Sequence, residues 1–256
     1  MTRLPDEAFT ALDVVEAVLG RPALGAILSG SAVDGGLRPL SDVDLIVVVE
    51  DAPDEAARGR LAVALMGVSG RYGGGPARPL DVTLVRRADV VPWRYPPKRA
   101  FAYGEWLRAA YEAGTGPAPG PHPDVAIALA QARAIGVALR GPAARHMLDP
   151  VPEADLRRAL LDAVPALLGD LRGDERNVLL TLARMWRTAA TGAFVPKDAA
   201  AAWAAARLPS ELGSSLVLAG RAYVGECADD WRGRDAVVAA LAERLRWEVE
   251  RVCRGS

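Results

Sequence analysis

Residues 29–44 read SGSAVDGGLRPLSDVD, and the apolar run LIVVV follows directly at residues 45–49. Such a β-branched run is typical of a buried strand. Side chains two residues apart on an extended chain point to the same side, so Asp42 and Asp44 are predicted to hold the same divalent ions. This stretch therefore predicts a strand that begins at an acidic pair.

A small Gly30-Ser31 pair lies between an apolar strand, predicted at residues 26–28, and an expected helix start. Backbone N–H groups at such a point are free to meet phosphate oxygens. A lone Asp-x-Asp pair is more often a solvated turn, but the glycine-serine pair and the apolar strand beside it favour function. A phosphate cradle next to metal carboxylates indicates phosphoryl or nucleotidyl transfer, in which two metal ions brace the attacking and leaving oxygens.

The bulk composition is that of a packed soluble protein. The 256 residues are 51% hydrophobic and 25% charged, and 31 basic residues against 32 acidic ones give a net charge of −1. Nucleic-acid enzymes usually carry a basic stripe, so a nucleic-acid partner is not expected. Apolar runs are shorter than the ~18 residues of a membrane span, which predicts no membrane partner and a cytoplasmic location. Cys227 and Cys253 are expected to be free thiols.

Apolar spacing predicts helices over residues 6–19 and 53–66, a strand over 43–49, a loop over 67–79 and a strand over 80–85 that should bring Asp81 close to the acidic pair. Residues 86–121 are proline-punctuated and read as irregular, and a helix resumes at residue 124. From residue 152 onward the predicted segments are helical, over 153–171, 175–190, 196–207, 211–223 and 236–252. The fold class is α+β: a nucleotidyltransferase domain at 1–150, with a mixed sheet flanked by helices, and an all-α bundle at 151–256.

Several motifs together resemble one family. The glycine-serine spacing to Asp-x-Asp resembles the DNA polymerase β-like nucleotidyltransferases. The chain is more narrowly similar to the aminoglycoside (3'')(9) adenylyltransferases, in segments at residues 30–37 (GSAVDGGL), 92–96 (PWRYP), 104–106 (GEW), 141–144 (GPAA), 174–178 (DERNV) and 196–200 (PKDAA). The resemblance implies an enzyme that uses ATP and two Mg²⁺ ions to transfer AMP to a hydroxyl of streptomycin or spectinomycin, conferring resistance.

The resemblance also implies roles for individual residues. Asp42 and Asp44 become magnesium ligands. The nucleotide is expected to contact Gly30, Ser31 and Ser41 in the first domain and Arg184, Lys197 and Tyr223 in the second. A surface salt bridge for Arg184 and a solvated helix start for Lys197 stay open as alternatives.

Asp81 takes the place of a third carboxylate, both as a metal ligand and as the base that accepts the proton of the attacking hydroxyl. The resembled family has Glu here, immediately before Val-Thr, so the side chain at position 81 of this chain is one methylene shorter. A purely metal-binding or exposed strand-end Asp81 stays open as an alternative.

The acceptor is cationic, so its site needs carboxylates and a flat apolar wall. Trp106, Asp170 and Asp174 supply these residue types, with Glu105 and Asp124 as further candidates. The resemblance at Trp106 and Asp174 implies activity on both drugs. As alternatives, Trp106 is packing and Asp174 is a helix N-cap.

Three rival functions remain at this point. One is a nucleotidyltransferase with a different acceptor, another is a nucleotide-binding protein with little turnover, and a polymerase-type activity is least favoured. We expect a monomer, and we assign no role to His122 or His146.

Overall fold

The structure, a computed structural model, describes residues 4–72 and 75–255. The chain divides into two compact units, Met1–Val151 and Pro152–Ser256, and each is described by itself. Within the described residues, no helix combines the length and the apolar character that crossing a membrane requires.

A mixed β-sheet forms the centre of the first unit, as the sequence predicted. Its strands among the described residues are β1 (Gly25–Leu28), β2 (Val43–Val49), β3 (Leu80–Arg86), β5 (Phe101–Gly104) and β7 (Val137–Arg140), in the order β5-β3-β2-β1-β7. β2 and β3 run parallel, and the other neighbours are antiparallel. A separate pair joins β4 (Lys98–Arg99) to β6 (Gly120–Pro121).

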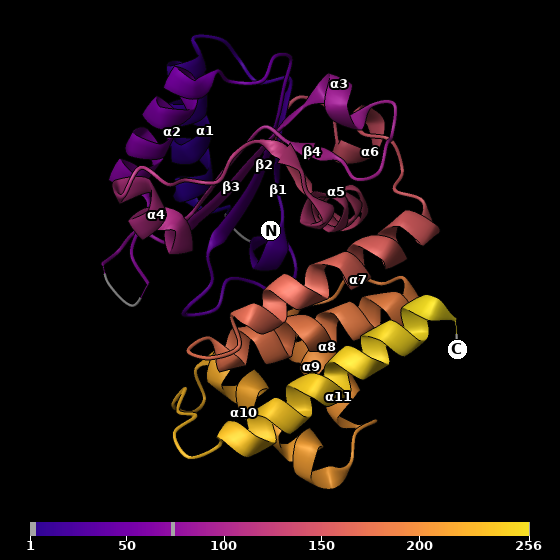
Figure 1. Ribbon diagram of the computed structural model, residues 1–256. Helices are drawn as coiled ribbons and strands as arrows, with labels where there is room; N and C mark the ends of the chain where they lie inside the picture. The colour runs from indigo at the N-terminus through magenta and orange to yellow at the C-terminus, as the bar shows by residue number, and fades with distance from the viewer. Residues whose placement is uncertain (1–3, 73–74, 256) are drawn as a thin grey trace. The chain divides into compact units, whose positions relative to one another are not determined.

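Helices cover both faces of this sheet (Figure 1). On one face lie α1 (Asp6–Leu19) and α2 (Glu55–Val68), whose apolar side chains share a buried core with alternate residues of the strands. On the other face lie α5 (Pro123–Ile135) and α6 (Ala144–Met147) with their own buried cluster. The nearly continuous apolar run of β2 fits a central strand that is buried on both faces, whereas β3 alternates between buried and partly exposed residues.

Two local predictions in this unit were wrong. The expected helix start at Gly30 is a single 3₁₀ turn, η1 (Gly30–Ala32), because the chain soon reaches Gly35 and Gly36 at φ 79° and 86°, values that end a right-handed helix. The stretch expected to be irregular contains α3 (Arg87–Val90), strand β5, a second 3₁₀ turn η2 (Glu105–Leu107) and α4 (Arg108–Glu112).

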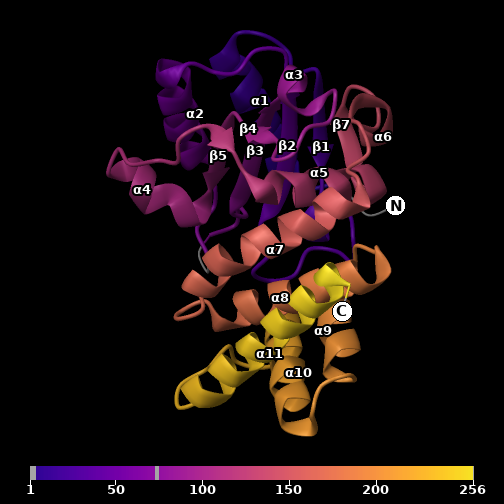
Figure 2. The ribbon, with the colours of Figure 1, turned by 45° about the vertical axis from the view of Figure 1, so that its right-hand side comes forward.

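The second unit is helical throughout its regular elements, as predicted. These are α7 (Glu153–Gly169), α8 (Glu175–Thr191), α9 (Lys197–Ala205), α10 (Ser210–Val224) and α11 (Asp235–Arg254). Figure 2 shows α8 at the centre of this group, and it contacts each of the other four helices. Its apolar side chains, including Leu179, Leu182 and Trp186, are buried among them.

Candidate active site

Three aspartates meet at the N-terminal ends of two neighbouring parallel strands, β2 and β3. Asp42 immediately precedes β2, Asp44 lies within β2, and Asp81 of β3 pairs with Asp44 in the parallel register. One carboxylate oxygen of each lies within 4.8 Å of the others, and all three residues are half-buried. The juxtaposition predicted from the sequence is therefore confirmed, and the carboxylates are close enough to share cations.

The glycine-serine turn presses against one of these carboxylates. Gly30 has φ 63°, and a Cβ placed on it would lie 1.8 Å from Oδ2 of Asp44. The Ser29 N–H donates a hydrogen bond of 3.0 Å to the Asp44 carbonyl oxygen, which ties the turn to β2. Ser31 follows within η1. Only glycine suits position 30, because both the backbone angle and the adjacent carboxylate exclude a side chain.

Ser41, the other serine predicted to contact phosphate, is buried just before the acidic pair. Its Oγ accepts a hydrogen bond of 3.0 Å from the Arg38 N–H. The Arg78 guanidinium donates to the carbonyl oxygens of Arg38 at 2.8 Å and Ser41 at 3.2 Å. These bonds hold the segment that delivers Asp42 to the start of β2.

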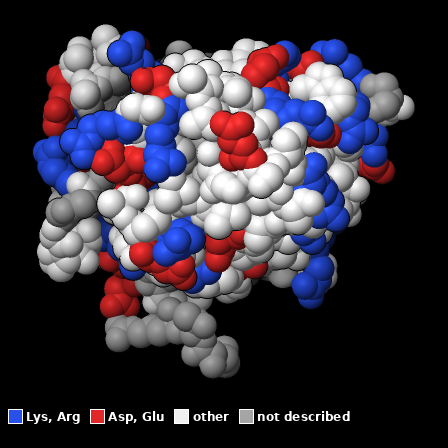
Figure 3. Space-filling model, turned by 90° about the horizontal axis from the view of Figure 1, so that it is seen from below, with Lys and Arg blue, Asp and Glu red and all other residues white. Residues whose placement is uncertain are grey.

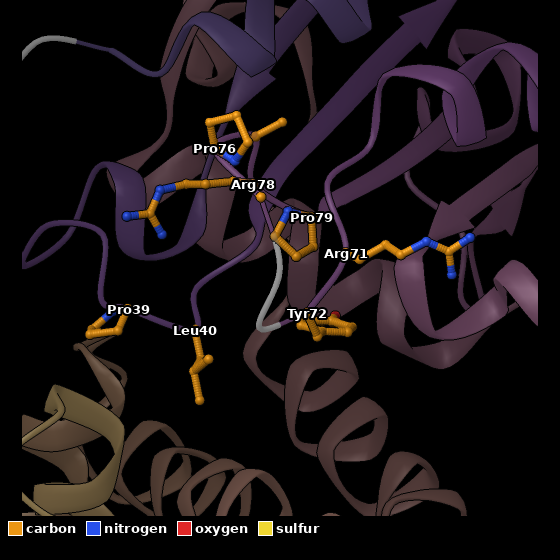
Figure 4. Close-up of a pocket in the computed structure, with 9 residues that line it drawn as sticks. Pro39, Leu40, Arg71, Tyr72, Pro76, Arg78 and Pro79 are labelled. Atoms are coloured by element: carbon orange, nitrogen blue, oxygen red, sulfur yellow. The ribbon is translucent and has the colours of Figure 1, made fainter.

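A pocket next to this segment is shown in Figure 4. Its lining consists of Pro39, Leu40, Arg71, Tyr72, Gly75, Pro76, Ala77, Arg78 and Pro79. The guanidinium groups of Arg71 and Arg78 point in opposite directions in this view. Because the two cations do not converge, we do not assign this pocket to phosphate.

Trp106 lies in the turn η2, directly after β5, the strand that pairs with the Asp81 strand. Its side chain is 55% exposed, so it is not a core residue. A Cβ placed on Gly104 would lie 2.4–2.5 Å from three atoms of its six-membered ring, which means that the indole covers this glycine. Gly104 in turn pairs directly with Asp81 across β5 and β3. The structure therefore brings Trp106 to the acidic triad.

Glu105, a candidate for the acceptor site, is instead committed to the interior of the first unit. Its Oε2 accepts hydrogen bonds of 2.9 Å from the Ser69 and Tyr103 hydroxyls. Arg108 donates to both carboxylate oxygens, at 2.5 and 2.9 Å, and the Glu105 side chain is only 5% exposed. Every acceptor oxygen is thus occupied, and we do not carry Glu105 into the acceptor site.

Arg99 is a cation near the triad that the sequence analysis did not single out. Burial lowers its pKa, while the nearby charges of Asp124, Tyr111 and Asp81 act to raise it. Arg99 belongs to β4, which contacts β3, the strand that carries the candidate base Asp81. His122 Nδ1 lies 3.5 Å from Oδ2 of Asp124, and burial together with Arg99 lowers the pKa of this histidine. A single arginine in a proline-rich stretch gives no sequence signal for such a position.

Two of the predicted residues in the helical unit, Lys197 and Asp174, are linked through Asn177 of α8. The Lys197 ammonium donates to Oδ1 of Asn177, and Nδ2 of Asn177 donates to Oδ2 of Asp174 at 2.9 Å. Asp174 stands at the N-cap position of α8, but its side chain caps no backbone N–H, so the capping alternative does not account for it. Arg184 follows Asn177 by two helical turns and shares its face of α8. Asn177, which links a predicted nucleotide residue to a predicted acceptor residue, was missed.

The last two predicted residues differ in exposure. Asp170 is exposed at the end of α7. Tyr223 on α10 is 9% exposed, so most of its ring packs within the helical unit.

A glycine-serine turn against paired acidic strands, in a mixed sheet followed by a helical unit, is the arrangement of a nucleotidyltransferase. The fold also matches the crystal structure of spectinomycin adenyltransferase AAD(9) from Enterococcus faecialis with ATP and spectinomycin, with a TM-score of 0.90 and 31% identity over 96% of this chain and 98% of that one.

Similar sequences of known name narrow the class from nucleotidyltransferases in general to one family. The chain is 46% identical over 249 residues to a spectinomycin 9-adenylyltransferase of Staphylococcus aureus, covering 97% of this chain and 96% of the relative. It is 42% identical over 253 residues to an aminoglycoside (3'') (9) adenylyltransferase of Escherichia coli, covering 96% of each. Residues 146–248 match the family described as "Aminoglycoside adenylyltransferase, C-terminal domain". The chain belongs to the aminoglycoside adenylyltransferase family.

Proposed function

We propose that this protein transfers AMP from ATP to a hydroxyl group of spectinomycin and of streptomycin, and thereby confers resistance to them. The observation that carries the proposal is the convergence of Asp42, Asp44 and Asp81, within 4.8 Å, in a chain whose relatives are named adenylyltransferases. The solved neighbour that contains both ATP and spectinomycin supports the two substrates.

The donor set at the triad fits magnesium. Each aspartate offers a hard carboxylate oxygen, and Mg²⁺ prefers such oxygens and is typically held by one or two carboxylates together with substrate phosphates. We assign Asp42 and Asp44 to two Mg²⁺ ions, with Asp81 completing the set. When bound there, these ions would neutralise triphosphate charge and stabilise the charge that develops at the phosphorus.

The residues of the chain itself have distinct tasks in this proposal. Backbone N–H groups of the Gly30-Ser31 turn and the Ser41 hydroxyl bind phosphate oxygens. Arg184 and Lys197 contribute positive charge toward the phosphates, and Tyr223 contacts the base or the ribose. These groups hold ATP so that its α-phosphorus faces the acceptor, which is the positioning that phosphoryl-type transfer chiefly requires.

Asp81 accepts the proton. The drug hydroxyl oxygen attacks the α-phosphorus, its proton passes to the Asp81 carboxylate, and the bond from the α-phosphorus to the bridging oxygen breaks to release pyrophosphate. A base must come within about 2.6–3.2 Å of the proton, directly or through one water. The shorter Asp81 arm, relative to Glu, is therefore the feature of this site that limits reach.

Replacing Asp81 tests this role. Asp81→Asn removes the base, and we expect kcat to fall at least about 100-fold, measured as pyrophosphate released from ATP with each drug. Asp81→Glu restores the longer arm, and we expect its kcat to equal or exceed that of the unmodified protein. An active Asp81→Asn variant would remove Asp81 as the base. Equal activity of the Asn and Glu variants at a trace level would favour a nucleotide-binding protein with little turnover.

The acceptor range rests on Trp106 and Asp174, with Asp170 and Asp124 as further carboxylates for a cationic drug. The indole offers a flat face for a guanidinium group, and Asp174 offers an exposed carboxylate. Identity alone does not choose the range, since relatives named for position 9 and for both positions are similarly close. A pyrophosphate assay across a drug panel decides between these drugs and a different acceptor.

Two further expectations belong to this proposal. A reaction that consumes ATP is expected in the cytoplasm, and the protein is expected to act as a monomer, which light scattering at working concentration tests.

Acidic and basic side chains are interspersed on the face seen in Figure 3, in keeping with a small-molecule acceptor. Binding to RNA or DNA that weakens steeply with salt would instead favour a nucleic-acid substrate.

A further inference from the structure

Gly104 occupies a position in the sheet where a side chain would normally stand beside Asp81. The two residues are direct partners in the antiparallel β3–β5 pairing. Side chains of directly opposed residues project from the same face of a sheet, with Cβ atoms about 4.5–5.5 Å apart. Asp44 is likewise the direct partner of Asp81 on the other side. A side chain at position 104 would therefore stand on the same face as these two carboxylates.

The indole of Trp106 fills this vacant position. A Cβ on Gly104 would meet Cη2, Cζ3 and Cζ2 of Trp106 at 2.4, 2.4 and 2.5 Å, which is closer than real Cβ atoms approach any neighbour. The six-membered ring thus stands where the side chain of residue 104 would be. It follows that Trp106 lies on the carboxylate face of the sheet, one strand away from Asp81.

The turn η2, which carries Trp106, is held in place by the preceding strand β5 and by the contacts of Glu105. It follows β5 directly as η2, and Glu105 within it is fixed by Ser69, Tyr103 and Arg108. This buried ionic group leaves Trp106 little freedom to leave the strand end, while its outer surface stays 55% exposed. A glycine within a strand often marks a place where another group approaches the backbone closely.

We propose that Gly104 is a positioning residue, whose missing side chain lets the Trp106 indole lie flat beside Asp81 as the wall against which the acceptor packs. This inference rests on the proposed function, because the acceptor is the molecule that uses the wall. An aromatic face one strand from the base orients a cationic ring system so that its hydroxyl points toward Asp81. Gly104 acts only through Trp106 and does not touch the substrate.

The test is a double-mutant cycle on acceptor kinetics. Gly104→Ala adds one methyl group in the place of the indole, and we expect kcat/KM for the acceptor to fall about tenfold, the size of one cation–π contact. The KM for ATP should change less than about twofold, since the nucleotide residues are untouched. In a Trp106→Ala background the same Gly104→Ala change should have less than about a twofold further effect.

Gly25→Ala is the matched control. Gly25 is also a buried strand glycine, and its added Cβ would meet the Met147 side chain at 2.3–2.4 Å, at the end of β1 far from Asp44 in the register. It should lower the unfolding temperature to a similar extent while leaving acceptor kcat/KM unchanged, which separates sheet damage from loss of the wall.

The outcomes separate this inference from the function on which it rests. If the unmodified protein releases no pyrophosphate with either drug, the proposed function fails and the acceptor wall fails with it. If the unmodified protein is active and Gly104→Ala is equally active, the positioning role alone is overturned. A Gly104→Ala loss that persists undiminished in the Trp106→Ala background also overturns it, because the glycine would then act through the strand.

Discussion

The buried ionic group around Glu105 gives a prediction whose size follows from its contacts. Glu105→Gln keeps the shape of the side chain but removes its charge, leaving Arg108, itself only 12% exposed, without its partner. Breaking a buried ion pair by removing one member costs about 3–5 kcal/mol. Arg108 keeps its 3.0 Å bond to the Met66 carbonyl oxygen, so we expect the lower end, about 3 kcal/mol.

Calorimetry measures this loss. One kcal/mol corresponds to about 2–4 °C in unfolding temperature for a unit of this size, so the transition of the first unit should move down by about 6–12 °C. Asp51→Asn is the control from the same unit, because Asp51 pairs with Arg21 at an exposed site, where such pairs contribute about 0–1 kcal/mol. Equal shifts in the two variants would refute the assignment of Glu105 to a stabilising buried group.

The same group predicts a pH dependence with a definite sign. Burial opposes ionisation of Glu105, but hydrogen bonds from Arg108, Ser69 and Tyr103 outweigh it and hold its pKa below the ordinary value of 4.5. Since the folded pKa is the lower one, the stabilisation is fully present above pH 4.5 and is lost as the pH falls through the folded value. The difference between the unmodified protein and Glu105→Gln should therefore narrow below that pH.

Two further predictions concern the site. Gly30→Ala forces a methyl group onto the Asp44 carboxylate and should lower kcat at least about 100-fold. Gly36→Ala is the control: its φ is also positive but nothing lies within 4 Å of the added Cβ, so it should lower stability and change kcat little. Equal kcat values for the two variants would contradict the close approach of Gly30 to Asp44. Asn177→Ala removes the hydrogen bonds that link Lys197 through Asn177 to Asp174, and it should raise the KM for the acceptor about 2–10-fold in steady-state kinetics. An unchanged KM would show that this link has no role in acceptor binding.

Long amphipathic helices and the two central strands could be predicted from the sequence because their signals are local. The predicted helix at residues 6–19 has the same bounds as α1, and the expected strand at residues 43–49 is β2. The edge strands β5 and β7 were missed. Each has four residues, too few for periodicity to separate a strand from a short apolar turn, and their pairing depends on distant partners.

The residues of the candidate site also fall into those with a local sequence signal, which could be predicted, and those without one, which could not. The acidic triad could be predicted since Asp42 and Asp44 share a motif and Asp81 lies on the next strand. Glu105 could not be placed, because its partner Ser69 is 36 residues away and reaches it only in the folded sheet. Asn177 lacked a signal for the same reason, as its link to Lys197 spans two helices.

The pairing of Asp44 with Asp81 constrains how the gene can change. Alternate residues of a strand face opposite sides, so sliding β3 by a single position would turn the third carboxylate away from its two companions. Insertions and deletions inside either strand are therefore excluded, and the connection between α2 and β3 can vary only where Ser69 and Arg78 keep their contacts with Glu105 and with the segment before Asp42. Within this lineage, drug resistance should survive only those changes in loop length that preserve these contacts and the alignment of the two strands.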